Sequence, residues 1–413
     1  MPADGAAPTV VVVGCTTASP HGQDQMRRLA EQARARGVRL LGTDTAANLR
    51  SGIWRMPADE FTELEFTDAD ADTCRAFAAA HPEVRAVMTL KEAGVVPAAL
   101  LADAFGVAGN SVEAARTIRT KDLCRTVLRA AGLDQPRFTV VSDLAAARAF
   151  LADTDRAGTG PWIVKPRDGQ GSAGVSLVRS AADLPTALAR VDSGRPFLIE
   201  EFIEGDEFSA EGVMAGGNLR ILTLTRKRTG AGFIETGHRT PAGLAPTTDA
   251  AARAAVVRAV TAAGVTHGLV HAEFWVTGEG DVVLGEIHAR PGGDFIHALV
   301  EHTLPRFEMF GALLDDLLGH PPQETPPQCG AAGVEFIVLD AGRVQSVEGW
   351  EKATDQPALL AADLDVRPGD VLAAVGSSAD RHGVFVAGAA TADEVEAVLA
   401  GARDSLRIEI GAP

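Results

Sequence analysis

The sequence predicts a mixed α/β protein built from several domains, and three observations support that prediction. Strand-like and helix-like segments alternate over the first 110 residues, two pairs of strands follow at 162–178 and 269–290, and a Pro-rich segment at 320–330 precedes a β-rich end. The chain has 413 residues, of which 46% are hydrophobic and 23% are charged. That length allows roughly two to four domains with cores of ordinary size.

The first domain is expected to be an open α/β sheet with parallel strands. The apolar run TVVVVG (9–14) shows no alternation of polar and apolar residues, which is typical of a strand buried on both faces. A helix over about 23–36 and strands over 38–44 and 85–90 continue the alternation of elements. The passage GVAGNSVEAARTIRTKDLCRTVLRAAGL, starting at residue 106, is expected to be largely helical and to follow this domain.

The rest of the chain alternates short strands with helices. PRFTVV, PWIVKP and PFLIEEFI predict strands, while AADLPTALARV and FEMFGALLDDLLG predict helices. Further helices are expected over 143–152, 249–263 and, within the β-rich end, 391–402. The resulting domain boundaries are 1–112, 113–196, 197–322 and 323–413.

Charge and cysteine usage exclude several classes of protein. The net charge of −17 and the pI near 5.0 argue against a nucleic-acid or anionic-membrane surface, although a local pocket for a nucleotide stays compatible with them. No apolar run reaches the length that spans a bilayer, and MPADGAAPT lacks the basic region of a signal peptide. The four scattered cysteines form no CxxC pair, so free thiols in the cytoplasm are expected.

The hairpin LVHAEFWVTGEGDVVLGEIHAR carries the strongest chemical signal. Pairing around its central turn places Glu273 opposite Glu286, and the same register places His271 opposite His288. Directly opposed Cβ atoms lie about 4.5–5.5 Å apart, and like charges there are destabilising. The two carboxylates are therefore expected to share a divalent cation such as Mg²⁺, with His288 as a third ligand or a neighbouring donor. The alternative is a solvent-facing hairpin whose charges are hydrated.

Two further stretches suit a nucleotide. In WIVKPRDGQGSAGVSLV, Lys165 ends a strand before a Gly-rich loop whose backbone N–H groups can approach phosphate oxygens, although the spacing is not that of a Walker A motif. In FLIEEFIEGDEF, Glu200 and Glu201 end a strand, where an acid beside exposed backbone can read an adenine amino group, and Glu207 can hold ribose hydroxyls. A flexible hairpin and solvated acidic residues are the respective alternatives.

The order of these motifs resembles the ATP-grasp superfamily. Helix-borne Lys121 comes first, then Lys165 and the Gly-rich loop, the strand that ends in two glutamates, Glu273, and finally GEIHARPGG. The element ETGHRTPA and the β-rich end are most similar to the L-amino acid ligase branch. The resemblance implies an ATP-grasp fold. Its parts would be a pre-ATP-grasp domain, linker helices with a lid, a C-terminal half that holds the metal site, and a small β-rich C-terminal domain.

The resemblance also implies a role for each site residue. ATP phosphates would be contacted by Lys121, Lys165, Gly169, Gly171, Ser172 and Gly174, and the adenosine by Glu200, Glu201, Phe202, Ile203 and Glu207. The metal ligands would be Glu273, Glu286 and His288. The amino-acid substrates and an acyl phosphate would be held by Glu92, Glu235, His238, Arg290, Gly293 and Asp294. The catalytic set within these would be Lys165, Glu235, His238 and Arg290.

Two positions stay open. The family usually has Asn where this chain has His288, and imidazole suits Mg²⁺ less well than an amide oxygen, so Mn²⁺ is an alternative to Mg²⁺. Asp294 either selects a cationic or hydroxylated substrate group or caps the following helix. Glu92, Glu235 and His238, taken singly, would more commonly be surface or capping residues.

The implied activity is an ATP-dependent ligase that joins a small carboxylic acid to an amine through an acyl phosphate, with ATP and Mg²⁺ as cofactors. Within the fold, the alternatives are other acceptors, namely a carrier-protein thiol, a hydroxyl or bicarbonate. A nucleotide-binding protein without catalysis is a further alternative. A dehydrogenase is disfavoured because VVVVGCTTASPHG lacks a full GxGxxG motif. A homodimer and a carrier-protein partner both stay open, whereas nucleic acid and membrane are not expected as partners.

Overall fold

The computed structural model describes residues 7–66, 70–153, 155, 158–191 and 194–411. The chain begins with the expected parallel sheet, whose strand order is β3-β2-β1-β4. Its elements are β1 (Thr9–Val13), α1 (Pro20–Ala35), β2 (Arg39–Asp44), α2 (Ala46–Arg50), β3 (Glu60–Glu63), α3 (Ala71–Ala80), β4 (Val84–Thr89), the 3₁₀ turn η2 (Glu92–Gly94) and α4 (Val95–Phe105).

Strand β1 is buried on both faces, as its apolar run predicts. Val10 and Val12 pack with α1 and with residues near 296–317, whereas Val11 and Val13 pack toward α3 and α4. The loops after β1 and β4 leave the carboxyl edge of the sheet, where ligands gather in open α/β domains. This topology brings Glu92 to the side of the domain that faces the rest of the chain.

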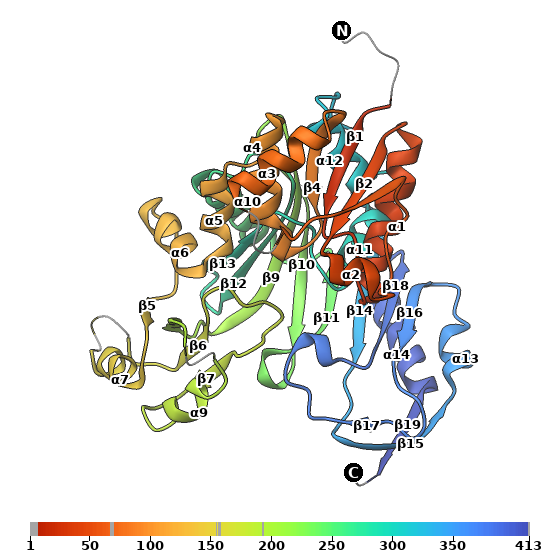
Figure 1. Cartoon of the computed structure of the whole chain (residues 1–413). Coiled ribbons are helices and arrows are strands. Elements are labelled where there is room, and N and C mark those ends of the chain that lie inside the picture. Colours follow the sequence, from red (N-terminus) through yellow and green to blue (C-terminus); the bar gives the residue numbers. More distant parts are fainter. Residues whose placement is uncertain (1–6, 67–69, 154, 156–157, 192–193, 412–413) are drawn as a thin grey trace.

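The helices α5 (Val112–Arg119) and α6 (Lys121–Ala130) lead to a separate four-stranded sheet with the order β5-β8-β6-β7. Its elements are β5 (Phe138–Val141), α7 (Leu144–Ala152), β6 (Trp162–Pro166), β7 (Ser176–Val178), α9 (Leu184–Leu188) and β8 (Phe197–Glu201). Strands β6 and β7 pair antiparallel and hold the Gly-rich loop between them. This part of the chain projects at the lower left of Figure 1.

The largest sheet has eight strands in the order β13-β12-β9-β10-β11-β14-β18-β16. Its first part comprises β9 (Gly205–Ala215), β10 (Asn218–Thr229), η3 (Ala231–Phe233), β11 (Glu235–Thr240), α10 (Pro246–Ala262), β12 (Leu269–Thr277), β13 (Val282–His288), α11 (Ile296–Thr303) and α12 (Met309–Leu317). Helix α10 packs over β10 and β13 and covers one face of this sheet, whereas the opposite face is open toward the four-stranded sheet β5-β8-β6-β7.

The β-rich end contributes strands to the same sheet. Its elements are β14 (Ala331–Ile337), β15 (Gly342–Glu348), α13 (Trp350–Thr354), β16 (Leu359–Leu364), β17 (Val371–Leu372), η4 (Ser378–Asp380), β18 (Gly383–Ala389), α14 (Ala392–Ser405) and β19 (Arg407–Gly411). Because β14 pairs antiparallel with β11, hydrogen bonding continues across the expected boundary at residue 323. Only β17, β15 and β19 form a sheet of their own, at the lower right of Figure 1.

The mixed α/β class and the β-rich C-terminal part are confirmed, while the four domain boundaries stay a prediction. Within the described residues, no helix combines the length and apolarity needed to cross a bilayer.

Candidate active site

A cavity of about 250 Å³, called the cleft below, lies between the four-stranded sheet β5-β8-β6-β7 and the open face of the eight-stranded sheet. Its wall contains most of the residues expected from the sequence, namely Lys121, Lys165, Gly169, Gly171, Ser172, Glu200, Glu201, Phe202, Ile203, Glu207, Glu235, His238, Glu273, Glu286, His288, Arg290, Gly293 and Asp294. Gly174 and Glu92 are not part of this wall. Glu92 nevertheless bonds to two residues that are.

The hairpin β12–β13 differs from its expected register at one point. His271 pairs with His288 as expected, but the ladder shifts by one residue between Ala272 and Phe274. Two residues of β13, Gly285 and Glu286, lie opposite the single residue Glu273 of β12, which is a β-bulge on β13. The bulge therefore replaces the expected one-to-one pairing of Glu273 with Glu286. Within the bulge, a Cβ on Gly285 would lie 2.9 Å from the Glu273 carbonyl oxygen.

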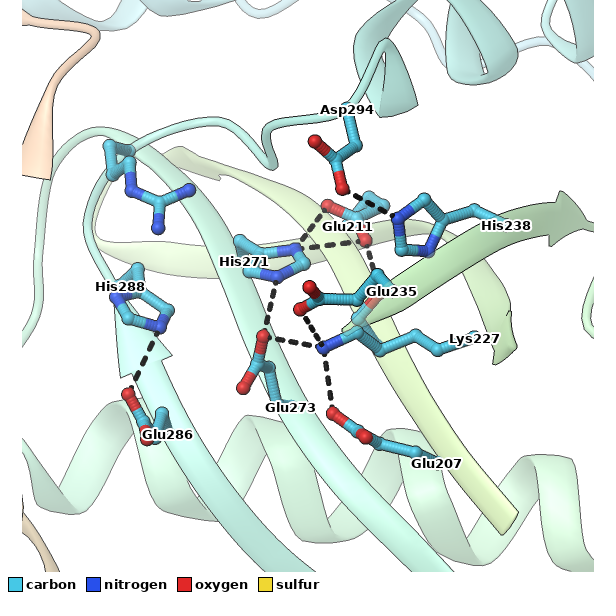
Figure 2. A network of polar contacts seen from close by, with 12 residues as sticks. Glu207, Glu211, Lys227, Glu235, His238, His271, Glu273, Glu286, His288 and Asp294 are labelled. Carbon is cyan, nitrogen blue, oxygen red and sulfur yellow. Dashed lines mark hydrogen bonds and ion pairs between the residues drawn. The ribbon is translucent and has the colours of Figure 1, made fainter. Parts of the chain in front are cut away.

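The bulge leaves three candidate metal ligands close together. One ligand atom from each of Glu273, Glu286 and His288 lies within 4.8 Å of the other two. Figure 2 shows Glu286 and His288 side by side on one strand, with Glu273 on the next. One oxygen of Glu273 accepts a hydrogen bond from Lys227, and the other lies on the side facing Glu286. This donor set fits an oxygen-preferring divalent cation with one nitrogen ligand.

His288 is oriented by a carboxylate behind it. Its Nδ1 lies 2.8 Å from Oε2 of Glu92, which is almost fully buried. Burial opposes ionisation of Glu92, but His288 and Arg290 outweigh it and hold the pKa of this carboxyl well below its usual range. The ionised carboxylate can only accept, so Nδ1 carries the proton. Nε2 then lies 3.7 Å from Glu286 and is the ring nitrogen that a metal ion would contact.

Glu286 also faces the two lysines expected to contact phosphates. Lys121 Nζ lies 3.0 Å from its Oε2, and Lys165 Nζ lies 3.4 Å from its Oε1. Burial opposes ionisation, but the two ammonium groups prevail and lower the pKa of Glu286 from 4.5 to about 2. Lys121 also donates to the carbonyl oxygen of Gly169 at 2.7 Å, which connects α6 to the Gly-rich loop. The positive charge of the cleft is thus concentrated beside the candidate metal ligands.

Glu200 differs from the free acid that adenine recognition would use. Its Oε2 accepts from Arg125 at 2.7 Å and its Oε1 contacts Lys165 at 2.7 Å, so both oxygens are already paired with cations. Arg125, which the sequence analysis did not single out, is one of the largest fully buried side chains. In this arrangement Glu200 fixes Lys165, and an adenine amino group is left to backbone atoms of Glu201–Ile203.

Lys227 is the main site residue absent from the expected set. Its ammonium lies 2.7 Å from Glu207, 2.8 Å from Glu273 and 3.6 Å from Glu235 (Figure 2). Burial alone would lower the pKa of Lys227, but the three carboxylates raise it well above its usual value. The sequence feature that could have identified Lys227 is the alternation of side chains along β10, which places Lys227 on the same face as the buried residues Thr223 and Thr225.

A second pair of missed side chains lies behind Glu273. His271 Nε2 lies 3.3 Å from Glu273, and its Nδ1 lies 3.0 Å from Glu211, whose other oxygen accepts from Ser209 at 2.7 Å. Burial opposes the charged imidazole, but Glu211 outweighs it and raises the pKa of His271 to about 9. Glu273 is thus supported by two cations, His271 and Lys227. A local strand pattern predicts the orientation of His271 but not its contact with Glu211 on β9 or that of Glu273 with Lys227 on β10.

Asp294 does not cap the helix that follows it. The N-cap of α11 is Phe295, which has φ 60° and makes no side-chain cap. The Asp294 carboxylate instead contacts His238 Nε2 at 3.0 Å and Arg381 Nη1 at 2.8 Å. Burial opposes its ionisation, yet these partners hold the pKa of Asp294 well below its usual range. The capping alternative is therefore wrong.

Glu235 and Arg290 complete the end of the cleft expected to hold the amino acids. Glu235, at the start of β11, accepts a hydrogen bond from the hydroxyl of Ser378, a C-terminal residue on the cavity wall. Arg290 donates through Nε to Glu92 at 2.8 Å and through Nη1 to the carbonyl oxygen of Pro291 at 2.8 Å. Carboxylates and a guanidinium therefore alternate at this end, which suits ammonium and carboxylate groups of small substrates.

Comparison with known proteins agrees with this architecture. Residues 159–298 match the ATP-grasp domain, and residues 335–411 match the L-amino acid ligase C-terminal domain 2. The crystal structure of an L-amino acid ligase from Bacillus licheniformis aligns with a TM-score of 0.81 at 23% identity, over 99% of this chain and 100% of that one.

Two sequence relatives are more partial. An uncharacterised protein from Sinorhizobium fredii is 25% identical over 310 residues, which cover 73% of this chain and 63% of that protein. Alanine–anticapsin ligase from Bacillus subtilis is 30% identical over 183 residues, 38% of each chain. The chain thus spans less than two thirds of either relative. The matches establish that this chain carries an ATP-grasp domain and a C-terminal domain of the L-amino acid ligase type.

Proposed function

We propose that this protein is an ATP-dependent carboxylate–amine ligase that joins two amino acids by an amide bond. The observation that carries the proposal is the meeting of two sites in one cavity. Glu273, Glu286 and His288 lie beside Lys121 and Lys165 at one end, and a carboxylate–guanidinium set lies at the other. Such a cavity can hold a triphosphate next to an amino acid. The relatives named above as ligases support the same chemistry.

The first half-reaction would convert the substrate carboxylate into an acyl phosphate. Lys121 and Lys165 would hold the ATP phosphates, and the Gly-rich loop between β6 and β7 would cover them. A divalent cation held by Glu273, Glu286 and His288 would neutralise phosphate charge during the transfer. Arg290, fixed by Glu92 and by the Pro291 carbonyl, would align the acceptor carboxylate for in-line attack on the γ-phosphorus.

The second half-reaction needs an amine that has lost its proton. Glu235 is the candidate for holding the substrate ammonium and accepting that proton, because it lies on the cavity wall and is held in position there by Ser378 and Lys227. Arg290 would stabilise the oxyanion as the amine attacks the acyl carbon and phosphate leaves. Enclosure between the two sheets would exclude water and limit hydrolysis of the acyl phosphate. The products would be ADP, phosphate and the amide.

The test is phosphate release from Mg-ATP across a matrix of paired amino acids, with Glu286→Gln as the blank. We expect release that requires two particular amino acids and disappears in the variant, because the neutral amide loses the charge that faces the cation and both lysines. Glu279→Gln, at the exposed turn of the same hairpin, is the matched control and should retain activity. ATP binding without turnover of any pair would contradict amide formation and direct attention to thiol, hydroxyl or bicarbonate acceptors.

A further inference from the structure

A short segment of the C-terminal domain reaches the cleft. The 3₁₀ turn η4 lies between β17 and β18 and places Ser378 on the cavity wall. The backbone N–H of Ser378 donates to the carbonyl oxygen of Gly171 in the Gly-rich loop at 3.0 Å, and its hydroxyl donates to Glu235. The C-terminal domain therefore contacts both the loop expected to cover phosphates and an acid expected to hold a substrate.

Arg381, at the end of this segment, neutralises Asp294. Its Nη1 and Nη2 lie 2.8 and 2.5 Å from the two different oxygens of the Asp294 carboxylate, which is a bidentate pair. Its guanidinium lies over the ring of Phe336, 3.4 Å from the centroid, and Nη1 also donates to the Glu235 carbonyl oxygen at 3.0 Å. The side chain of Arg381 is only 8% exposed and that of Asp294 only 15%, so water screens this pair weakly.

His238 adds a third group to the pair. Its Nε2 contacts the same Asp294 oxygen that accepts from Arg381 Nη1, and its side chain is only 2% exposed (Figure 2). The Asp294 carboxylate thus has a guanidinium on both oxygens and an imidazole on one of them. A cationic substrate group brought to this wall would meet an Asp294 carboxylate whose charge is already compensated by Arg381 behind it.

We propose that Arg381 is a specificity-determining residue supplied by the C-terminal domain, and that its pairing with Asp294 makes this wall of the cleft select substrates with uncharged side chains. The inference rests on the proposed ligase function and deepens it. It assigns a purpose to an acid that, alone on the wall, would favour a cationic side chain. Each partner of the pair compensates the charge of the other. Removing Arg381 should therefore admit cationic side chains, and removing Asp294 should admit acidic ones.

The test compares three variants on one substrate panel. The panel contains alanine and leucine as neutral amino acids, lysine and ornithine as cationic ones, and glutamate as the acidic one, each paired with the preferred partner. Phosphate release and product mass give kcat and KM for each amino acid, and KM for ATP is measured alongside. The variants are Arg381→Met, Asp294→Asn and the double substitution. Arg403→Met, which removes an exposed arginine of the same domain that pairs with Glu335, is the matched control.

We expect the wild-type protein and the control to prefer neutral amino acids. Arg381→Met should shift the ratio of kcat/KM toward the cationic amino acids by about tenfold or more, mainly through KM. Asp294→Asn should shift it toward glutamate, and the double variant should return to the neutral preference. Arg381→Lys, which keeps the charge, should also keep that preference, and it provides a readout even where Arg381→Met folds poorly.

Four results would overturn the inference. One is a wild-type preference for cationic amino acids. Another is an equal loss of kcat/KM for all side chains in both single variants, which would show that the pair stabilises the fold without selecting substrates. The third is a wild-type protein that turns over no amino-acid pair, which removes the proposed ligase function and this inference with it. Normal wild-type turnover with unchanged selectivity in the variants would refute the role of Arg381 alone and leave the ligase function standing.

Discussion

His288 is the candidate metal ligand in which this chain departs from the family pattern. The family usually places an asparagine at this position, whose amide oxygen suits Mg²⁺ better than an imidazole nitrogen does. Here the imidazole is oriented by Glu92, whose carboxylate accepts from Nδ1 at 2.8 Å and leaves Nε2 directed at Glu286. A carboxylate behind a histidine raises the basicity of the imidazole and fixes its tautomer. We therefore propose that His288 favours a metal ion that accepts nitrogen more readily than Mg²⁺ does.

The residue-scale prediction concerns metal preference. Replacing His288 with Asn should improve the ability of Mg²⁺ to displace Mn²⁺ by about tenfold, because the nitrogen ligand that favours Mn²⁺ is lost. Electron paramagnetic resonance of Mn²⁺, titrated with Mg²⁺ in the presence of a non-hydrolysable ATP analogue, measures this without turnover. His320→Asn removes a half-exposed imidazole outside the cavity and serves as the control. An unchanged displacement curve for His288→Asn would show that the imidazole is not a ligand.

Among the elements, the β12–β13 hairpin shows what the sequence could and could not predict. Period-two alternation and the central turn were sufficient for the pairing of His271 with His288. The bulge opposite Glu273 is not predicted, because a local pattern of alternation does not show where one strand of a hairpin holds an extra residue. Lys227 and Arg381 were missed for a related reason. Their partners lie on other strands and in a loop, up to 146 residues away along the chain, and short sequence patterns carry no information on such contacts.

Helix α1 is joined to α11 by a charged network, and this gives a prediction at the scale of elements. Asp24 contacts the buried His297 at 2.8 Å and Arg28 at 2.7 Å, and Arg28 reaches Glu301 at 2.7 Å. Burial opposes ionisation of Asp24, but His297 and Arg28 prevail and lower the pKa of this carboxyl below its usual value. Asp24→Asn should therefore reduce the free energy of unfolding by about 1–3 kcal/mol at pH 7.

The pH dependence of that loss follows from the sign of the shift. A carboxyl whose pKa is lowered on folding stabilises the protein above its unfolded pKa, near 4, and loses this contribution as the pH falls toward the folded value. The difference between wild type and Asp24→Asn should accordingly be largest near neutrality and shrink below about pH 4. Urea denaturation at pH 7 and pH 3.5 measures it. Asp72→Asn, at a side chain 85% exposed, should cost little at either pH, and an equal loss at both pH values for Asp24→Asn would contradict the electrostatic account.

At the scale of the whole molecule, the eight-stranded sheet makes the C-terminal domain part of the main fold. Strand β14 pairs with the edge of β11 and so extends the sheet. The apolar face of α11, including Leu299, packs against Val334 and Val386. The sequence predicted a small unit after a Pro-rich linker, because composition marks the linker but does not show which strand edges meet. The placement of Ser378 on the cavity wall, and of Arg381 against Asp294, depends on this sheet. Residues before the Pro-rich linker and the C-terminal domain that follows it are therefore expected to be stable only together.

Removal of residues 331–413 tests that dependence. The truncation would expose the edge of β11 and the buried face around Leu299, and both an unpaired strand edge and a large apolar patch promote aggregation. We expect the shortened chain to be largely insoluble, or to unfold well below the intact protein in thermal denaturation. As a control, a protease site placed in the linker between Pro321 and Pro327 cuts the chain without removing any strand of the sheet. The cleaved halves should stay associated and retain a melting temperature close to that of the uncut protein, whereas a soluble truncated chain of native stability would show that the sheet does not depend on its C-terminal strands.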